Sequence, residues 1–121
     1  MNKFTTEHIL SVKTLSETFK NELVQRITRN LLDIQILRLV RTRPMWGYMI
    51  KKQAEAKFNV RLRHGALYPL LNTMESKGFL TSERQQQGGR TRKVYTMTQK
   101  GKEYVEAYEG ILKEQIRKQD I

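Results

Sequence analysis

The chain has 121 residues and contains no cysteine, which excludes disulfide bonds and thiolate metal sites. Its two histidines, His8 and His64, are far apart in the sequence, and neither shows a metal-ligand spacing or the pattern of a nucleophile with its base. A glycine-rich loop of the kind that cradles phosphates is also missing. The sequence therefore does not indicate an enzyme, and we expect neither a cofactor nor a bound metal.

Long apolar segments are equally scarce, because apolar residues make up only 38% of the chain. The first residues lack the continuous apolar run of a secretory signal, and nowhere do about 18 apolar residues follow one another. We expect a cytoplasmic, nucleoid-associated protein with no membrane partner. The length suits one compact domain with an appended element, whose small core could be supplemented by packing against a second copy.

Positive charge is abundant by contrast. Lysine and arginine total 23 against 12 acidic residues, which gives a net charge of +11. The excess lies mainly in residues 38–63 and 84–102, whereas the acidic residues outnumber the basic ones from Glu103 onward. One-sided charge predicts attraction to a polyanion, with nucleic acid as the first candidate and an anionic membrane surface as the second. A merely charged, soluble surface is the remaining interpretation.

Apolar periodicity predicts four helices between residues 6 and 77. The first covers residues 6–28 and carries one apolar stripe, made by Val12, Leu15, Phe19, Leu23 and Ile27. The second covers residues 31–41, with Asn30 as its N-cap and Asp33 near its positive end, and is apolar enough to form the buried centre. The third spans Trp46–Lys57, where Trp46 shares a face with Ile50 and Ala54. The fourth spans Arg63–Lys77 and should end at Gly78, with its first turn distorted by Pro69.

Two strands and a last helix are predicted for the remainder. The strands cover Phe79–Arg84 and Arg92–Met97, and a polar, flexible loop over residues 85–91 separates them. Thr98 caps a helix that reaches about Lys118. This order predicts a mainly α (α+β) winged helix-turn-helix. We divide it into an N-terminal amphipathic helical arm (1–29), a winged helix-turn-helix domain (30–97) and a C-terminal dimerisation helix (98–121).

The fourth helix and the hairpin carry the candidate contacts to DNA. In a helix-turn-helix the second helix enters the major groove, where arginine and asparagine can read base edges and an alanine methyl can contact thymine. The predicted major-groove residues are Arg63, His64, Ala66, Tyr68, Asn72 and Thr73. Arg90, Arg92 and Lys93 of the wing would contact the backbone or the minor groove, and Lys51, Lys52 and Arg61 would add phosphate contacts. The alternative for each set is an ordinary solvated surface.

Five short motifs strengthen this interpretation. They are WGYMI at 46–50, GALYPLL at 65–71, KGFL at 77–80, GRTRKVY at 89–95 and TQKG at 98–101. Together they resemble the PadR family of transcriptional regulators, whose segments read His-Gly-Tyr-x-Ile, Gly-Thr-Leu-Tyr-Pro-Leu-Leu, Lys-Gly-Leu-Ile, Gly-Arg-x-Arg-Lys-x-Tyr and Thr-x-x-Gly. The resemblance covers roughly residues 30–112.

The resemblance implies a winged-helix homodimer that binds double-stranded operator DNA, usually as a repressor, and that responds in some relatives to a small-molecule effector. Its dimer contacts would come from the C-terminal helix, through Tyr104, Val105, Tyr108, Ile111, Leu112 and Ile116. Three residues depart from the family pattern, because Trp46, Arg63 and Ala66 stand where histidine, serine and threonine are usual. For Trp46 we favour a place in the core over a place in the wall of a ligand pocket.

A second function remains open on the sequence alone. An abundant architectural protein that coats or bends DNA with little sequence preference would also profit from a charge of +11. The two functions differ in the ratio of specific to non-specific affinity, which should be about 10³ or more for a regulator.

Overall fold

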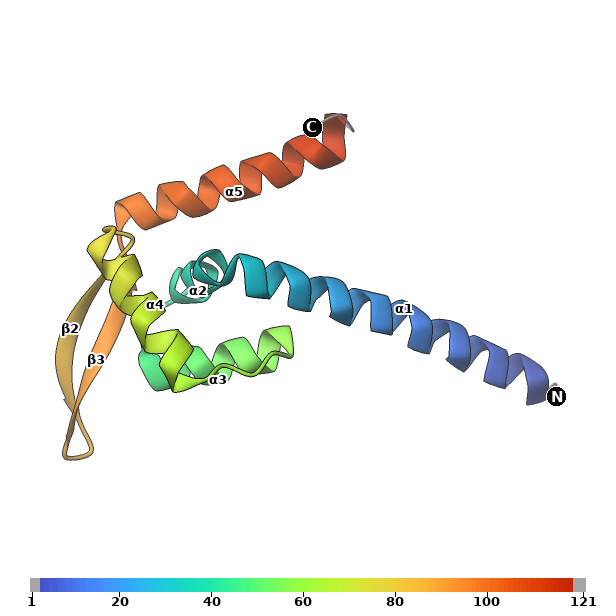
Figure 1. Ribbon diagram of the computed structural model, residues 1–121, viewed down its shortest axis with the longest axis horizontal. Helices are drawn as coiled ribbons and strands as arrows, with labels where there is room; N and C mark the ends of the chain where they lie inside the picture. The colour runs from blue at the N-terminus through green and yellow to red at the C-terminus, as the bar shows by residue number, and fades with distance from the viewer. Residues whose placement is uncertain (1–2, 119–121) are drawn as a thin grey trace.

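The computed structural model describes the backbone of residues 3–118 and the side chains of residues 14–86 and 88–118. This part of the chain folds into five helices and one small antiparallel sheet (Figure 1). The elements are α1 (Lys3–Asn30), α2 (Leu32–Val40), β1 (Met45–Trp46), α3 (Gly47–Phe58), α4 (His64–Ser76), β2 (Leu80–Gln87), β3 (Arg90–Met97) and α5 (Gln99–Lys118). The mainly α winged-helix class is confirmed. The side chains of His8 and Val12 lie outside the described residues.

The core forms around α2, as its apolar character predicts. Ile36 and Leu37 are completely buried there, and α2 is contacted by α1, α3, α4, α5 and β3. The buried cluster also takes one or more side chains from most other elements, among them Ile50, Leu67 and Tyr95. Because burial of each large apolar side chain stabilises a fold by about 1.5–3 kcal/mol, α2 is the element on which the others depend.

The junction between α1 and α2 differs from the prediction. Asn30 does not cap α2, because it is the last residue of α1 and its side-chain amide donates to the carbonyl of Arg26. Leu31 occupies the cap position and offers no side-chain hydrogen bond. Asp33 partly replaces the missing cap, since its Oδ1 accepts the N–H of Ile34 at 2.8 Å. The two helices are thus separated by a single bent residue, because the sequence there contains no strong helix breaker.

The sheet contains a third strand that the periodicity did not reveal. Met45 and Trp46 form β1 and pair with Tyr95 and Val94 of β3, giving the strand order β1-β3-β2. Trp46 therefore precedes α3 in an extended conformation and does not share a helical face with Ile50. It is only half-buried and lies outside the core cluster, so its expected place in the core is wrong.

The wing is longer and more regular than predicted. β2 and β3 pair in an unbroken register from Leu80 opposite Met97 to Gln87 opposite Arg90. Only Gly88 and Gly89 remain as the loop, with φ of 55° and 79°. A two-residue hairpin turn with positive φ at both positions matches the right-handed twist of the strands. The expected flexible loop over residues 85–91 is therefore wrong, because cross-strand pairing outweighs the polar composition.

Both ends of α4 are defined by backbone hydrogen bonds. At the start, the N–H groups of Ala66 and Leu67 both donate to the carbonyl of Arg63, and the helix continues unbroken through Pro69. At the end, Phe79 donates to Met74 and Gly78 donates to Glu75, with Gly78 at φ +83°. This paired pattern is the Schellman motif, so the predicted stop at Gly78 is confirmed.

Helix α5 is fastened to the domain at its first half. The predicted cap is present, since the hydroxyl of Thr98 accepts the N–H of Gly101 at 3.0 Å. Val105 is completely buried in the core of its own chain, so it has no surface left for the predicted dimer interface. Farther along, Arg41 donates to both carboxylate oxygens of Glu109, at 3.0 and 2.9 Å.

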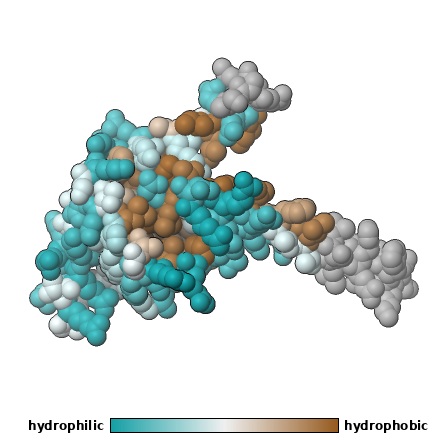
Figure 2. Space-filling model, viewed as in Figure 1, coloured by the Kyte–Doolittle hydropathy of each residue, from teal (hydrophilic) through white to brown (hydrophobic). Residues whose placement is uncertain are grey.

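Beyond these contacts, α1 and α5 diverge from α2 as two arms on the side of the molecule away from the wing (Figure 1). Their apolar residues stay exposed, including Phe19 (54%) on α1 and Ile111 (56%) and Ile116 (82%) on α5. Figure 2 shows hydrophobic side chains gathered in the space between the arms. These surfaces are left uncovered by the residues that the structure describes.

The wing is tied to α4 by Glu75. Its carboxylate accepts hydrogen bonds from the hydroxyl of Ser82 on β2 and, at 3.4 Å, from the ammonium of Lys93 on β3. The Ser82 bond is the main cause that lowers the pKa of Glu75, with Lys93 adding to it. The hydrogen bond from Arg41 likewise lowers the pKa of Glu109. Two partly exposed carboxylates thus fix the wing and α5 on opposite sides of the domain.

Replacing Gly101 by alanine should destabilise the protein by about 1–3 kcal/mol, the usual range for overpacking. A Cβ at this position would lie 2.3 Å from the backbone oxygen of Phe79, which cannot move aside easily. Gly110 on the same helix is the matched control, because nothing lies within 4 Å of its Cβ position. Gly110→Ala should stabilise by about 0.5–1 kcal/mol through helix propensity. Urea unfolding of both variants measures the difference, and equal effects would contradict the packing argument.

Stability should decline as the pH falls through the acid range. The pKa values of Glu75 and Glu109 are lower in the folded state than the ordinary value of 4.5, so the unfolded state binds protons first on acidification. Their contribution is complete above this value and is lost below the folded-state pKa values. Glu75→Gln and Glu109→Gln should flatten the decline, whereas Glu103→Gln, an exposed neighbour on α5, should not. Unfolding midpoints measured between neutral and acidic pH test this, and an unchanged slope in all three variants would refute it.

Candidate nucleic-acid interface

The start of α4 and the tip of the wing lie at the same end of the molecule (Figure 1). Leu67, Leu71 and Met74 bury one face of α4 in the core and so fix its orientation. The other face carries the predicted major-groove residues, of which Arg63, His64, Ala66, Asn72 and Thr73 are all exposed. Fold geometry thus brings these side chains to one surface, where the hairpin stands beside them.

Tyr68 is held firmly on this surface. Its ring stacks on His64 with 5.6 Å between centroids and an interplanar angle of 5°. On the other side it approaches the first residue of α3 so closely that a Cβ on Gly47 would lie 2.6 Å from the tyrosine ring. Any side chain at position 47 would therefore force the Tyr68 ring to shift. Tyr68 stays about one third exposed (36%), with its hydroxyl end beside Gly47.

The polar residues farther along α4 differ in whether their side chains are already hydrogen-bonded. The hydroxyl of Thr73 donates to the carbonyl of Pro69 at 3.0 Å, which satisfies the donor that Thr73 would offer to a base. Asn72 makes no side-chain hydrogen bond with any residue that the structure describes. Of these two predicted residues, Asn72 is the better placed to recognise an outside partner.

The three predicted wing cations have different surroundings. Arg90 begins β3 at the tip and is exposed. Lys93 is paired with Glu75, and its ammonium lies 5.7 Å from the ring centroid of Tyr95. Arg92 is half-buried, with its guanidinium carbon 4.0 Å from the ring centroid of Trp46. Arg84, which faces Lys93 across the ladder and is exposed, is a further wing cation that only the register identifies.

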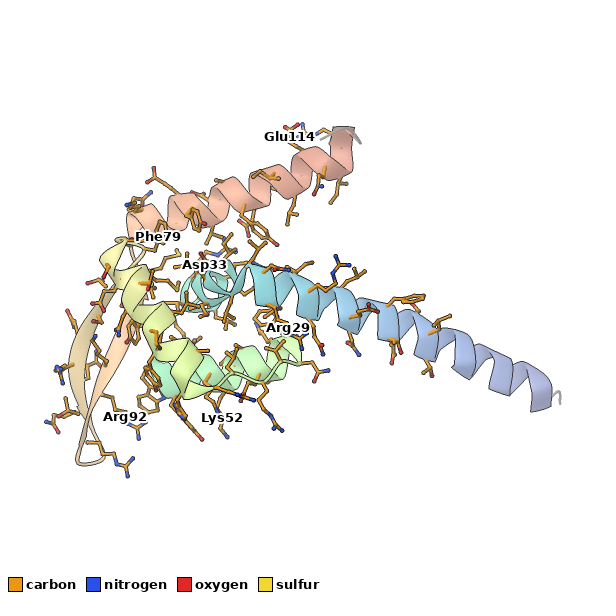
Figure 3. All side chains as sticks on the ribbon, in the orientation of Figure 1. Arg29, Asp33, Lys52, Phe79, Arg92 and Glu114 are labelled. Atoms are coloured by element: carbon orange, nitrogen blue, oxygen red, sulfur yellow. The ribbon has the colours of Figure 1, made fainter. Side chains whose placement is uncertain are left out.

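The remaining predicted cations flank the same surface. Lys51 lies 3.8 Å from Glu55, one turn along α3, and Lys52 lies 5.5 Å from the ring centroid of Tyr48. Arg61 is exposed in the connection between α3 and α4. In Figure 3, Lys52 and Arg92 point to the same side of the molecule although they come from α3 and the wing. The folded chain therefore collects positive charge from α3, the connection and the wing around the start of α4.

A cleft of about 220 Å³ lies at the base of the wing. Its lining residues are Trp46, Gly47, Tyr48, Tyr68, Thr91, Arg92, Lys93 and Tyr95. Trp46 is thus a wall residue, which was the less favoured of its two predicted places. Two shielded donors, Nε1 of Trp46 and Nε of Arg92, have no acceptor among the described residues. Burial raises the pKa of the Tyr95 hydroxyl, so the phenol stays neutral and both charged residues of the cleft are cations.

Among the described residues, no group of three or more histidine, aspartate or glutamate side chains is placed to hold a metal ion. None of the described helices has both the length and the apolar character needed to cross a membrane.

Known proteins share this arrangement. A crystal structure of a PadR family transcription regulator from Clostridium difficile is 31% identical, covers 67% of this chain and 85% of its own, and superposes with a TM-score of 0.62. A transcriptional regulator from Thermoplasma acidophilum is 32% identical, with coverage of 73% and 85% and a TM-score of 0.65. No curated protein sequence matches the chain.

One similar structure contains DNA. The Bacillus subtilis PadR protein in complex with operator DNA is 28% identical and superposes with a TM-score of 0.60. The match covers 64% of this chain and 45% of that protein, so this chain corresponds to less than half of its length.

The family itself is identified by sequence. The model of the transcriptional regulator PadR-like family matches residues 36–107, from α2 into α5, which is more than half of the chain and includes α4 and the wing. Members of this family are transcriptional regulators, which confirms the expectation that the protein is not an enzyme. With its winged-helix fold and its matching motifs, this chain belongs to the PadR-like family of transcriptional regulators.

Proposed function

We propose that this protein is a sequence-specific regulator that binds double-stranded DNA as a homodimer and represses transcription by occupying its operator. The observation that carries the proposal is the single surface on which the exposed start of α4, the basic wing and the cations of α3 come together. The net charge of +11 supplies long-range attraction to the DNA backbone. The complex of the related Bacillus subtilis protein with its operator supports the same choice of partner.

Base contacts and phosphate contacts are assigned to different residues. Arg63, His64 and Asn72 project from the exposed face of α4 and can reach base edges in the major groove, with Ala66 beside a thymine methyl. The ring of Tyr68 is fixed by its packing, and its hydroxyl suits a phosphate. Base contacts determine which sequence is bound, whereas phosphate contacts set the position of the protein on the duplex.

Phosphate contacts come from the elements around α4. Arg90 at the wing tip, Arg61 in the connection, and Lys51 and Lys52 on α3 surround the recognition helix on two sides. Arg63 stands at the N-cap of α4 without making a capping hydrogen bond. A cation at the positive end of a helix is unfavourable alone, but a phosphate between them would be attracted by both.

The homodimer is proposed from the uncovered apolar surfaces of the two arms. On α5, Tyr104, Ile111, Leu112 and Ile116 are exposed and Tyr108 is half-buried, and on α1 Leu15, Phe19, Leu23 and Ile27 form a matching exposed row. A second copy would bury both rows. Two-fold symmetry would then present two α4 helices to successive major grooves, about 34–36 Å apart.

An architectural protein with little sequence preference is the second candidate. The positive charge on every element around α4 favours it, because such contacts do not depend on sequence. The exposed, unpaired side chain of Asn72 favours the regulator, since this residue type reads adenine.

Selection of bound DNA from a random pool at about 150 mM salt, followed by sequencing, tests the proposal. We expect an enriched inverted repeat with half-sites one helical turn apart. Asn72→Ala should relax the preference at one base position, whereas Arg90→Ala should weaken binding to all sequences alike and flatten the salt dependence by about one unit of slope. Strong binding without enrichment would establish the architectural function, and absence of binding would refute both.

The homodimer makes a separate prediction. In sedimentation equilibrium at micromolar concentration, the protein should have twice the 14.3 kDa mass of the chain. Ile116→Glu should shift it toward the monomer, because it places a charge in the apolar row of α5. Gln115→Glu adds the same charge at the neighbouring exposed position and should have little effect. A wild-type protein that sediments only as a monomer would contradict the dimer.

A further inference from the structure

The contact between Arg92 and Trp46 is the least ordinary feature of the candidate interface. The guanidinium carbon lies 4.0 Å from the centre of the indole ring, well inside the distance of about 6 Å at which a cation is attracted to an aromatic face. The strand register explains this contact. Trp46 of β1 pairs with Val94 of β3, and Arg92 lies two residues from Val94 on β3, so its side chain is on the same face of the sheet as Val94 and Trp46. The stack therefore follows from the pairing of β1 with β3.

The charge of Arg92 is not neutralised by this contact. Its neighbour Lys93 has the carboxylate of Glu75 at 3.4 Å, but no carboxylate forms an ion pair with Arg92 among the described residues. Its Nε is shielded from solvent, yet the side chain still lines the cleft at the base of the wing. One face of the guanidinium is thus covered by the indole while the group keeps a full positive charge toward the cleft.

The rest of the cleft suits a phosphate. Tyr68 lines it from α4 and Lys93 from the wing, although the ammonium of Lys93 is already paired with Glu75. Gly47 lies at the first turn of α3, where backbone N–H groups and the positive end of the helix dipole favour an anion. The cleft opens between α4 and the wing, the two elements proposed to contact DNA.

We propose that Trp46 is a positioning residue for DNA binding, which holds the guanidinium of Arg92 ready to take one backbone phosphate in the cleft at the base of the wing. This inference rests on the proposed DNA-binding function and adds to it a phosphate site and the residue that prepares it. A long arginine side chain loses rotamer freedom when it binds, and stacking on a fixed ring removes that freedom in advance. Trp46 thus acts on DNA only through Arg92.

The test is a double-mutant cycle on DNA affinity. A labelled duplex of mixed sequence serves as the probe, and fluorescence anisotropy at several salt concentrations gives the dissociation constant of each variant. Trp46→Leu should weaken binding by about two- to thirty-fold, the range that cation–π energies span. Arg92→Gln should weaken it at least as much and reduce the salt slope by about one. In the Arg92→Gln background, Trp46→Leu should cause no further loss.

Two further variants separate positioning from a purely structural role. Trp46→Phe keeps an aromatic face and should retain most of the affinity that Trp46→Leu loses. Arg90→Gln removes a cation at the wing tip, four residues along β3 from Val94, the strand partner of Trp46, so its loss should add to that of Trp46→Leu. Thermal unfolding confirms that each variant is folded, and the indole emission of the wild type and of Arg92→Gln carries the test if Trp46→Leu is not folded.

The indole supplies an independent readout, because Trp46 is the single tryptophan of the chain. Its emission should change when Arg92→Gln removes the guanidinium, and addition of DNA should alter the emission of the wild type more than that of this variant. Equal losses from the Trp46 substitution in the presence and absence of Arg92 would overturn the inference, as would unchanged affinity in Trp46→Leu. Wild-type protein that binds no duplex would refute the proposed function itself, which is a different result.

Discussion

Helix α2 is apolar on almost every side, and its burial is the constraint on which the rest of the structure depends. Ile36 and Leu37 are fully shielded only because helices and the sheet surround them together. α3 and α4 each contribute one apolar face to this task, and α5 contributes Val105. The face of each surrounding helix that points to solvent is therefore determined by the face that it buries against α2. The exposed face of α4 is presented to solvent because Leu67, Leu71 and Met74 are needed inside.

The wing is positioned for a related reason. It has little apolar surface of its own near the tip, so its position depends on directed contacts at its base. Glu75 ties β2 and β3 to α4 through Ser82 and Lys93, and Trp46 contacts Arg92 from the short first strand. Unbroken strand pairing up to the Gly88-Gly89 turn extends the hairpin as far as Arg90. The angle between the hairpin and α4, and with it the spacing of their cations, is set at the base.

The two arms follow a different principle, because no described part of the chain covers their apolar rows. α1 continues far beyond the domain, and the outer half of α5 leaves it after the Arg41–Glu109 ion pair (Figure 1). Exposed apolar rows of this extent are costly in water unless another surface covers them. The placement of these rows opposite the wing separates the surface proposed for association from the surface proposed for DNA. This separation would allow both to be occupied at once.

Local features were readable from the sequence because their physical causes are local. The apolar character of residues 31–41, the stop at Gly78 and the cap at Thr98 each depend on a few neighbouring residues, and all three appear in the structure. The apolar periodicity likewise predicted the winged-helix class and, apart from β1, the order of elements, and the family motifs agree with it. The exposed face of α4 could be predicted for the same reason, since helical spacing separates its residues from those of the buried face.

Only the tertiary structure decided which residues far apart in the sequence contact one another. The strand at Met45–Trp46 is too short to be recognised alone and exists because β3 offers it a partner. That pairing moved Trp46 from an expected helix face to the side of Arg92, and the hairpin register exposed Arg84 beside Lys93. Val105 and Ile116 occupy one helical pattern in the sequence, yet the first is buried in the core and the second is exposed. Composition determined that the chain would be basic and apolar periodicity that it would be helical, whereas packing determined which of its charges and apolar residues remain at the surface.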